Sequence, residues 1–331
     1  MNSTRKFWLV LAGAILLMGI IACSCNGLSQ TPTATPAATP QPTPTEEPPT
    51  QTPIPPTPTV VYAGKIAFSR NGQIYVMNAD GSNQTQLANN ADHVTHPAWS
   101  PDGQKIAFDS VDSKGNFAIY VMNADGSDQT QIANDMVGDE CITWSPDGQK
   151  IAFSSSIRGG NGSIYVKHAD GTNQYRLTST KDMDGNPAWS PDGQKIAFDA
   201  SPDGGKNWAI FVMNADGSDL IRLTQDGHAI LPAWSPDGQK IAFNAGSSTD
   251  SGTWAIIVMN TDGSNQTKLA DNDMASNLAW SPDGKKIAFS YDDSANPTPN
   301  IYVMNADGSN ITRLTDTSEG WEGDQYPAWT R

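Results

Sequence analysis

Acidic side chains recur in short segments spaced between residues 92 and 324. Lys181 is the only basic residue among them. If the fold brings these segments to one face, they should attract cations, amines or basic peptides. Carboxylate oxygens could also bind Ca²⁺, although no ligand spacing singles out a site. The alternative is that the acids only keep the surface soluble. The thirteen acids are Asp92, Asp135, Asp139, Glu140, Asp182, Asp184, Asp226, Asp271, Asp273, Asp316, Glu319, Glu322 and Asp324.

Aromatic residues lie in the same variable parts of the chain. Three of them precede apolar β-type runs, and the others lie in neighbouring segments: Phe117, Trp208 and Trp254, then Tyr291, Trp321 and Tyr326. Aromatic faces at a loop rim can stack on sugars or anchor a peptide. We predict that Trp208, Trp254, Trp321 and Tyr326 anchor a ligand, and that Asp139, Glu140, Asp184 and Asp324 steer it. The alternative is that a residue such as Trp208 shares a strand face with Ile210 and covers the core.

Three histidines and one cysteine, His93, His96, His228 and Cys141, fall near the same segments. Imidazoles and a thiol can bind a transition metal, but here they come from separate segments without metal-type spacing. We therefore predict no metal site. His96 and Phe117 remain candidates for the ligand-binding face.

An internal repeat positions all of these residues. Its tryptophans are Trp99, Trp144, Trp189, Trp234, Trp280 and Trp329. A period of about 45 residues indicates a solenoid, a propeller or an array. The unit from Pro187 to Thr224 contains four short β-type runs, separated by Ser-Pro-Asp-Gly, a variable insert and Asn-Ala-Asp-Gly-Ser. Four strands in each unit, without a helical stretch, predict an all-β propeller of four-stranded antiparallel blades.

The repeated PAWSPDGxKIAF…IYVMNADGSN…RLT resembles the TolB-type, WD-repeat-like β-propeller family. The resemblance covers Lys65 to Arg331. It is specific for the fold but weak for function, because this repeat serves many unrelated roles.

Six KIAF-type strands predict six blades. The first unit lacks the strand that precedes Ser-Pro-Asp-Gly, and the last unit has only that strand, Tyr326 to Thr330. The C-terminal strand should therefore lie innermost in the first blade and close the ring, which removes exposed sheet edges. The two invariant turns of each blade should share one face. The variable connections, with the residues above, should form the other face, where we expect the function.

The first sixty residues are predicted to precede the fold. Residues 1–22 have basic Arg5 and Lys6 and a short apolar run, as in a secretory signal peptide. Ile20 to Cys23 resembles the lipobox of bacterial lipoproteins, which implies cleavage before Cys23 and lipidation of its thiol; the alternative is an uncleaved signal anchor. Residues 23–60 are rich in Pro and Thr, and we expect a disordered, extended tether. Residues 61–331 form the predicted propeller.

A net charge of −15 argues against a nucleic-acid partner. No G-x-S-x-G motif occurs, so we predict no enzyme. The predicted function is non-catalytic binding of an envelope protein or peptide by a monomer. That monomer is exported and held by its lipid anchor on the cytoplasmic membrane's outer face or on the outer membrane. The alternative is binding of a polysaccharide, and less so a glycosidase or lyase that uses channel carboxylates. No cofactor is expected.

Overall fold

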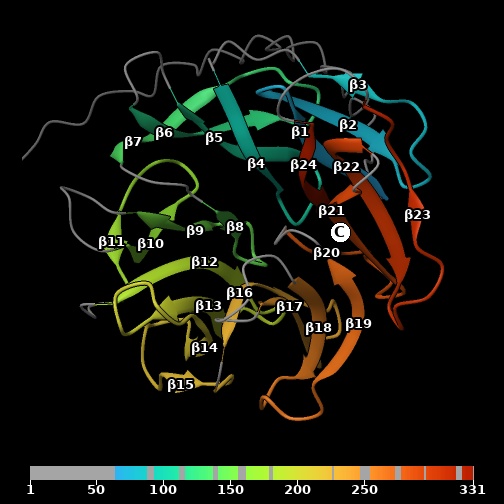
Figure 1. Cartoon of the computed structure of the whole chain (residues 1–331). Coiled ribbons are helices and arrows are strands. Elements are labelled where there is room, and N and C mark those ends of the chain that lie inside the picture. Colours follow the sequence, from blue (N-terminus) through green and yellow to red (C-terminus); the bar gives the residue numbers. More distant parts are fainter. Residues whose placement is uncertain are drawn as a thin grey trace, which may run out of the picture. The chain divides into compact units, whose positions relative to one another are not determined.

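Six β-sheets stand in a ring around a central channel (Figure 1). The computed structural model describes residues 64–87, 93–111, 116–136, 141–155, 162–178, 182–225, 227–246, 254–272, 277–293, 296–317 and 323–330. Each sheet has four antiparallel strands; five sheets follow chain order from the channel outward, and in the remaining one the last strand of the chain is innermost. The predicted six-bladed, all-β propeller is confirmed. Among the described residues, no helix is long and apolar enough to cross a membrane.

The first three blades contain twelve strands. Blade 1 comprises β24 (Asp324–Trp329), β1 (Lys65–Arg70), β2 (Gln73–Asn78) and β3 (Thr85–Gln86). Blade 2 comprises β4 (His93–Trp99), β5 (Lys105–Val111), β6 (Phe117–Asn123) and β7 (Thr130–Met136). Blade 3 comprises β8 (Ile142–Trp144), β9 (Lys150–Ser155), β10 (Ser163–His168) and β11 (Tyr175–Arg176).

The other three blades follow the same order. Blade 4 comprises β12 (Met183–Trp189), β13 (Lys195–Ser201), β14 (Ala209–Asn214) and β15 (Ile221–Arg222). Blade 5 comprises β16 (His228–Trp234), β17 (Lys240–Gly246), β18 (Trp254–Asn260) and β19 (Thr267–Asn272). Blade 6 comprises β20 (Ala279–Trp280), β21 (Lys286–Asp293), β22 (Asn296–Asn305) and β23 (Thr312–Arg313).

The core lies between neighbouring blades. The phenylalanine of each second strand is almost fully buried: Phe68, Phe108, Phe153, Phe198, Phe243 and Phe289. Ile74 and Val76 of blade 1, for example, pack in one cluster with Phe108 and Trp99 of blade 2. The second strands are apolar on both faces because each is covered by two adjacent blades.

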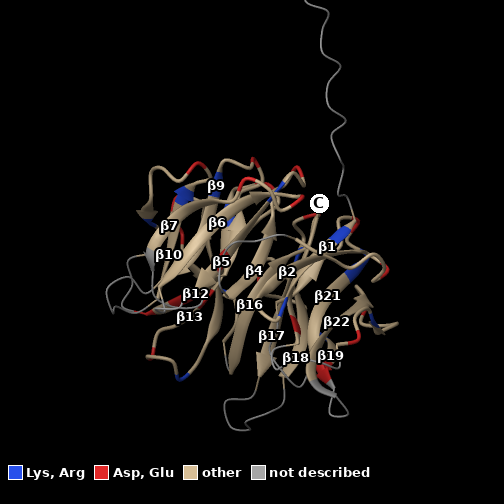
Figure 2. Cartoon of the chain, turned by 90° about the horizontal axis from the view of Figure 1, so that it is seen from above, with Lys and Arg blue, Asp and Glu red and all other residues tan. Residues whose placement is uncertain are grey.

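Each Ser-Pro-Asp-Gly turn is held by the same hydrogen bonds. In blade 4 the Ser190 hydroxyl donates to Asp192 at 2.6 Å and accepts from the backbone N–H of Lys195 at 2.9 Å. Asp192 also accepts from the N–H of Gln194 at 3.0 Å. The Asn-Ala-Asp-Gly-Ser turns lie on the same side of the ring, here called the turn face. In Figure 2, acidic residues mark these turns along the upper edge. The variable connections form the opposite side, the loop face.

The C-terminal strand closes the ring as predicted, since β24 pairs with β1. The N–H of Thr330 donates to the carbonyl of Lys65 at 2.9 Å, and the Thr330 hydroxyl accepts from the Lys65 N–H at 3.1 Å. Tryptophans join neighbouring blades around the channel: the indole N–H of Trp144 donates to the carbonyl of Ala98 at 3.0 Å.

The strands extend further toward the loop face than the sequence predicts. Asp135, Asp184, Asp271 and Asp324 lie in strands and not in loops, because pairing with the second or third strand continues past the repeated residues. Tyr291, also expected in a loop, lies in β21. Residues 1–63, with Cys23, lie outside the described residues, so the boundaries proposed there stay predictions.

Candidate functional site: the channel mouth

Six side chains at one position of the repeat meet at the loop-face end of the channel. They stand three residues before each repeat tryptophan, and we call them the inner ring: Tyr326, His96, Cys141, Asn186, Leu231 and Asn277. Where a proline follows, the backbone is left-handed, with φ between 46° and 57°. A β-bulge accompanies this conformation in blades 1, 2, 4 and 5. A bulge re-aims a side chain, so strand periodicity does not predict where these residues point.

The inner ring fills the axis of the channel. The amide of Asn277 donates to Cys141 Sγ at 3.9 Å, although the two residues belong to blades 6 and 3, on opposite sides of the ring. The rings of His96 and Tyr326 lie 3.9 Å apart. A ligand approaching from the loop face therefore meets a surface of side chains and not an open pore.

Behind the inner ring lies a cavity of about 230 Å³. It extends from Cys141 and Asn277 to Pro101, Pro236 and Pro282 of the turn face, and it is not enclosed. The repeat Pro-Ala-Trp residues form most of its wall. Because its walls are made of the same residues in nearly every blade, the cavity offers little to discriminate between ligands.

A second set of polar residues lies outside the inner ring. Each follows the buried phenylalanine of a second strand, and we call them the buried polar ring: Ser69, Asp109, Ser154, Asp199, Asn244 and Ser290. Asp109 is 3.1 Å from His96 Nδ1 and accepts from the Thr95 hydroxyl at 2.7 Å. Burial lowers the pKa of His96, but Asp109 and then Cys141 raise it, and the resulting pKa lies well above the usual value.

Asp199 occupies the same position in blade 4, where its hydrogen-bond partners among the described residues are uncharged. Asp199 Oδ2 accepts from the Asn186 amide and from the N–H of Leu231, each at 2.7 Å. Asp199 Oδ1 is buried and has no hydrogen-bond partner among the described residues. Burial therefore raises the pKa of Asp199 to about 6, with a smaller contribution from Asp184.

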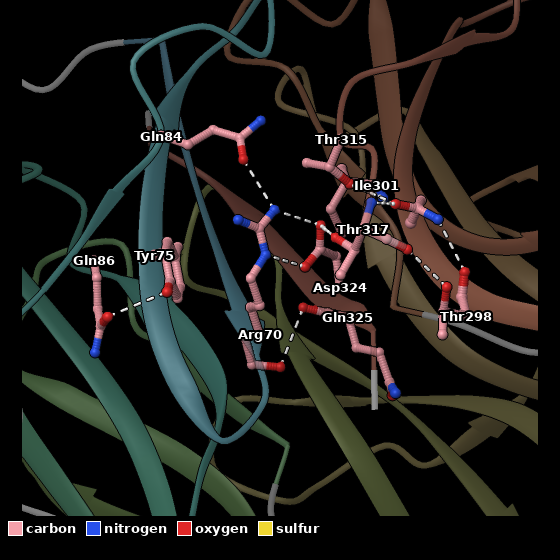
Figure 3. A network of polar contacts seen from close by, with 12 residues as sticks. Arg70, Tyr75, Gln84, Gln86, Thr298, Ile301, Thr315, Thr317, Asp324 and Gln325 are labelled. Atoms are coloured by element: carbon pink, nitrogen blue, oxygen red, sulfur yellow. Dashed lines mark hydrogen bonds and ion pairs between the residues drawn. The ribbon is translucent and has the colours of Figure 1, made fainter. Parts of the chain in front are cut away.

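Asp324, a predicted steering residue, is fully buried where blade 1 meets blade 6. Arg70 binds both of its oxygens, at 2.6 and 2.7 Å, and the Thr317 hydroxyl donates to it at 2.6 Å (Figure 3). The Arg70 guanidinium also covers the ring of Tyr75 at 4.8 Å. The hydrogen bond to Asp324 is the largest of the effects that raise the pKa of Arg70. The ion pair joins β1 to β24 within blade 1, and Thr317 connects the carboxylate to blade 6, so Asp324 has no exposed oxygen for a ligand.

Three aromatic residues gather at the loop face where blades 4 and 5 meet. The carbonyl of Trp208 accepts from the N–H of Ala229 at 2.9 Å, beside His228. The rings of His228 and Trp254 meet edge to face, with centroids 6.4 Å apart. All three side chains are half-buried. We call Trp208, His228 and Trp254 the aromatic cluster; its members connect the loop-face ends of blades 4 and 5.

The other predicted site residues are spread around the ring. Phe117 packs on the core between blades 2 and 3, and Tyr291 packs on that between blades 5 and 6. Asp184 is buried, at 3% exposure. Asp139, Glu140 and Trp321 lie outside the described residues. No group of three or more His, Cys, Asp or Glu residues within the described ranges could hold a metal ion.

The roles of Asp109 and Asp199, and of Arg70 as the partner of Asp324, were not predicted from the sequence. One signal could have revealed the inner ring: in an otherwise repetitive sequence, the residue three before each tryptophan is almost never the same twice. The buried polar ring gives a similar signal, because the residue directly after the phenylalanine of each KIAF run also varies among the blades.

Solved structures show the same fold at low sequence identity. TolB from Acinetobacter baumannii is 23% identical, with a TM-score of 0.71, and the match covers 82% of this chain and 67% of that one. A putative TolB from Agrobacterium tumefaciens is 24% identical, with a TM-score of 0.58, over 79% of this chain and 89% of that one. A chain of the nidogen/laminin complex is 14% identical, with a TM-score of 0.61, over 75% and 91%.

No curated protein matches the chain. The model of the TolB beta propeller domain family, PD40, matches residues 66–182, 172–277 and 224–330, well over half of the sequence. The repeat, the six blades and this match agree: the chain belongs to the TolB β-propeller domain family.

Proposed function

We propose that this protein is an exported, lipid-anchored propeller that binds an envelope protein or peptide, without catalysis, on its loop face. The aromatic cluster is the observation that carries the proposal. Half-buried tryptophans offer large apolar area with little loss of side-chain entropy, and such residues dominate binding energy at protein interfaces. The contacts across the channel mouth support recognition across a broad face, since Asn277 meets Cys141 over the axis and the ring of His96 lies against that of Tyr326.

The position of β1 leaves the loop face free. β1 begins at Lys65, beside Thr330, at the turn face of the ring, so the first described strand enters on the side opposite the variable connections. The expected Pro- and Thr-rich tether, which can reach on the order of 100 Å when extended, would let the propeller meet a partner at a distance from the anchor.

The direct test is capture from envelope extract with residues 61–331, which include every strand of the ring. A second bait carries Trp208→Ala and Trp254→Ala. A matched control carries Tyr175→Ala, which removes an exposed aromatic residue from the outer strand of blade 3. We expect a protein that binds the wild type and the control, and binds the double variant at least about tenfold more weakly.

Equal capture by all three baits would place the site away from the aromatic cluster. If no protein is captured but a polysaccharide binds and depends on the same tryptophans, the ligand class is a glycan. The anchor has a separate test: the full-length wild type should incorporate a labelled fatty acid and Cys23→Ser should not, and equal labelling of both would contradict lipidation at Cys23.

A further inference from the structure

Three asparagines occupy one position of the repeat, directly after an Asn-Ala-Asp-Gly-Ser or Asn-Thr-Asp-Gly-Ser turn. Each is followed two residues later by a threonine, which completes Asn-x-Thr, the acceptor motif for N-linked glycans in exported proteins. They lie in blades 5, 6 and 1, which are consecutive in the ring, since strands of blade 6 contact strands of both neighbours. The motifs are Asn83-Gln84-Thr85, Asn265-Gln266-Thr267 and Asn310-Ile311-Thr312.

The three motifs have one conformation at the outer edge of the ring. Asn83, Asn265 and Asn310 are left-handed, with φ of 54°, 53° and 54°, and every asparagine and threonine of the motifs is exposed. Each threonine is the first residue of the outermost strand of its blade, β3, β19 or β23 (Figure 1). A large substituent on these asparagines would therefore leave the cores between the blades unchanged, because the outermost strands lie farthest from the channel.

The groups that the modification requires are accessible. The side-chain amides of these three asparagines have no hydrogen-bond partner within the described ranges. The threonine hydroxyl donates to the backbone carbonyl of the asparagine of its own motif, at 3.3 Å in blades 1 and 5 and at 3.2 Å in blade 6. The amide that would carry the glycan is thus free, and the hydroxyl of the acceptor motif is held on the same turn.

The other three blades keep the turn but not the motif. Asp128 and Asp219 hold the position in blades 2 and 4, with φ of 53° and 52°, and each carboxylate accepts from an amide of its own turn at 2.8 Å. Blade 3 has Asn173, with φ of 50°, but Tyr175 stands where the motif requires threonine. Asn173 is therefore a natural control, because it has the same residue type and conformation without the hydroxyl.

We propose that Asn83, Asn265 and Asn310 carry N-linked glycans, which cover the outer edge of blades 5, 6 and 1. The co-reactant is an oligosaccharide carried on a lipid pyrophosphate and transferred by a membrane oligosaccharyltransferase. The amide nitrogen attacks C1 of the first sugar; an N–C bond forms, the C1–O bond breaks, the lipid pyrophosphate leaves and the amide loses one proton. The inference rests on export, which is part of the proposed function, and is independent of binding at the loop face.

The test uses the full chain, purified from membranes of the organism that produces it, with its peptides analysed by mass spectrometry. We expect a glycan mass on each of the three asparagines and none on Asn173. Thr85→Ala should remove the glycan from Asn83 alone and keep the thermal transition of the fold, since the lost hydroxyl is exposed. Tyr175→Thr completes the motif in blade 3 and should add a glycan to Asn173.

The outcomes separate this proposal from the proposed function. Unmodified Asn83, Asn265 and Asn310 would overturn it, and a fatty-acid label at Cys23 in the same preparation would show that export still holds. A glycan that stays on Asn83 in Thr85→Ala would also overturn it, because the motif would then not direct the modification. Capture by the aromatic cluster is measured on the loop face and does not depend on either result.

Discussion

The turn face and the channel mouth of this propeller use one repeat in opposite ways. On the turn face, Ser-Pro-Asp-Gly recurs in five blades with the same hydrogen bonds to within about a tenth of an ångström. At the channel mouth, one position of the same repeat holds six side chains of five types. Where the repeat is constant, its side chains close the same turn in each blade. Where it varies, side chains of different chemistry occupy equivalent positions around the channel.

Ring closure joins the first and last strands of the propeller, and we expect substitutions there to lower the stability of the fold most. Arg70→Ala leaves the buried carboxylate of Asp324 without its cation, and removing one partner of a buried ion pair costs about 3–5 kcal/mol. We expect a loss of that size in the free energy of unfolding, measured by urea denaturation. Lys268→Ala, which breaks the exposed pair with Asp271, is the control and should change little. Equal effects would show that Asp324 does not depend on Arg70.

We expect a smaller difference in stability between substitutions at constant positions of the repeat and substitutions at variable positions. Ser190→Ala removes a buried hydroxyl that serves both Asp192 and the Lys195 N–H, and leaving such groups unpaired costs about 1–3 kcal/mol. Leu231→Asn keeps the left-handed backbone, which Asn tolerates well, and copies Asn186 of the preceding blade. We expect it to change the melting temperature far less than Ser190→Ala. The reverse order would contradict the division between the two regions.

The smallest predicted effect is a difference in pH dependence between an acid of each region. Burial raises the pKa of Asp199 to about 6, so its contribution to stability is present below about pH 4 and is lost as the pH rises through 6. Asp192 has the opposite sign: the Ser190 hydroxyl and the Gln194 N–H lower its pKa, so its contribution is present above pH 4 and is lost in acid.

Urea midpoints at pH 4, 5.5 and 7.5 measure this contrast. Relative to the wild type, Asp199→Asn should gain stability as the pH rises from 4 to 7.5, because the variant has no buried carboxylate to ionise. Asp192→Asn should keep a nearly constant difference from the wild type over the same interval, because the contribution of Asp192 is lost only as the pH falls below about 4. Parallel curves for the wild type and Asp199→Asn would mean that Asp199 titrates normally.

The blades, their strand order and the closing strand could be predicted because they depend on local patterns. KIAF-type runs, turn residues and a fixed period are readable one unit at a time, and the unmatched strand at Tyr326 to Thr330 needs a partner. The channel mouth could not be predicted in this way. A bulge turns His96 and Leu231 against the strand alternation, and the pair Arg70–Asp324 joins residues 254 positions apart. Such contacts exist only once the ring is closed.

The predicted steering acids show the same limit. Asp184 and Asp324 are acidic residues in segments that read as surface loops, yet both are buried in strands. Pairing with β13 and β1 carries them inside. Trp208 and Trp254 were predicted to contact a ligand from their position in the repeat alone. In the structure the backbone of Trp208 bridges to that of His228, and the His228 ring meets the ring of Trp254.

Recognition on the loop face and a structural role for the turn face can be separated by hydrogen-exchange mass spectrometry, with and without the partner captured by the wild-type bait. We expect slower exchange in residues 205–210, 227–231 and 254–257 on binding, and no change in the turns at 190–193 and 214–218. Protection of those turns, with the aromatic cluster unaffected, would contradict it.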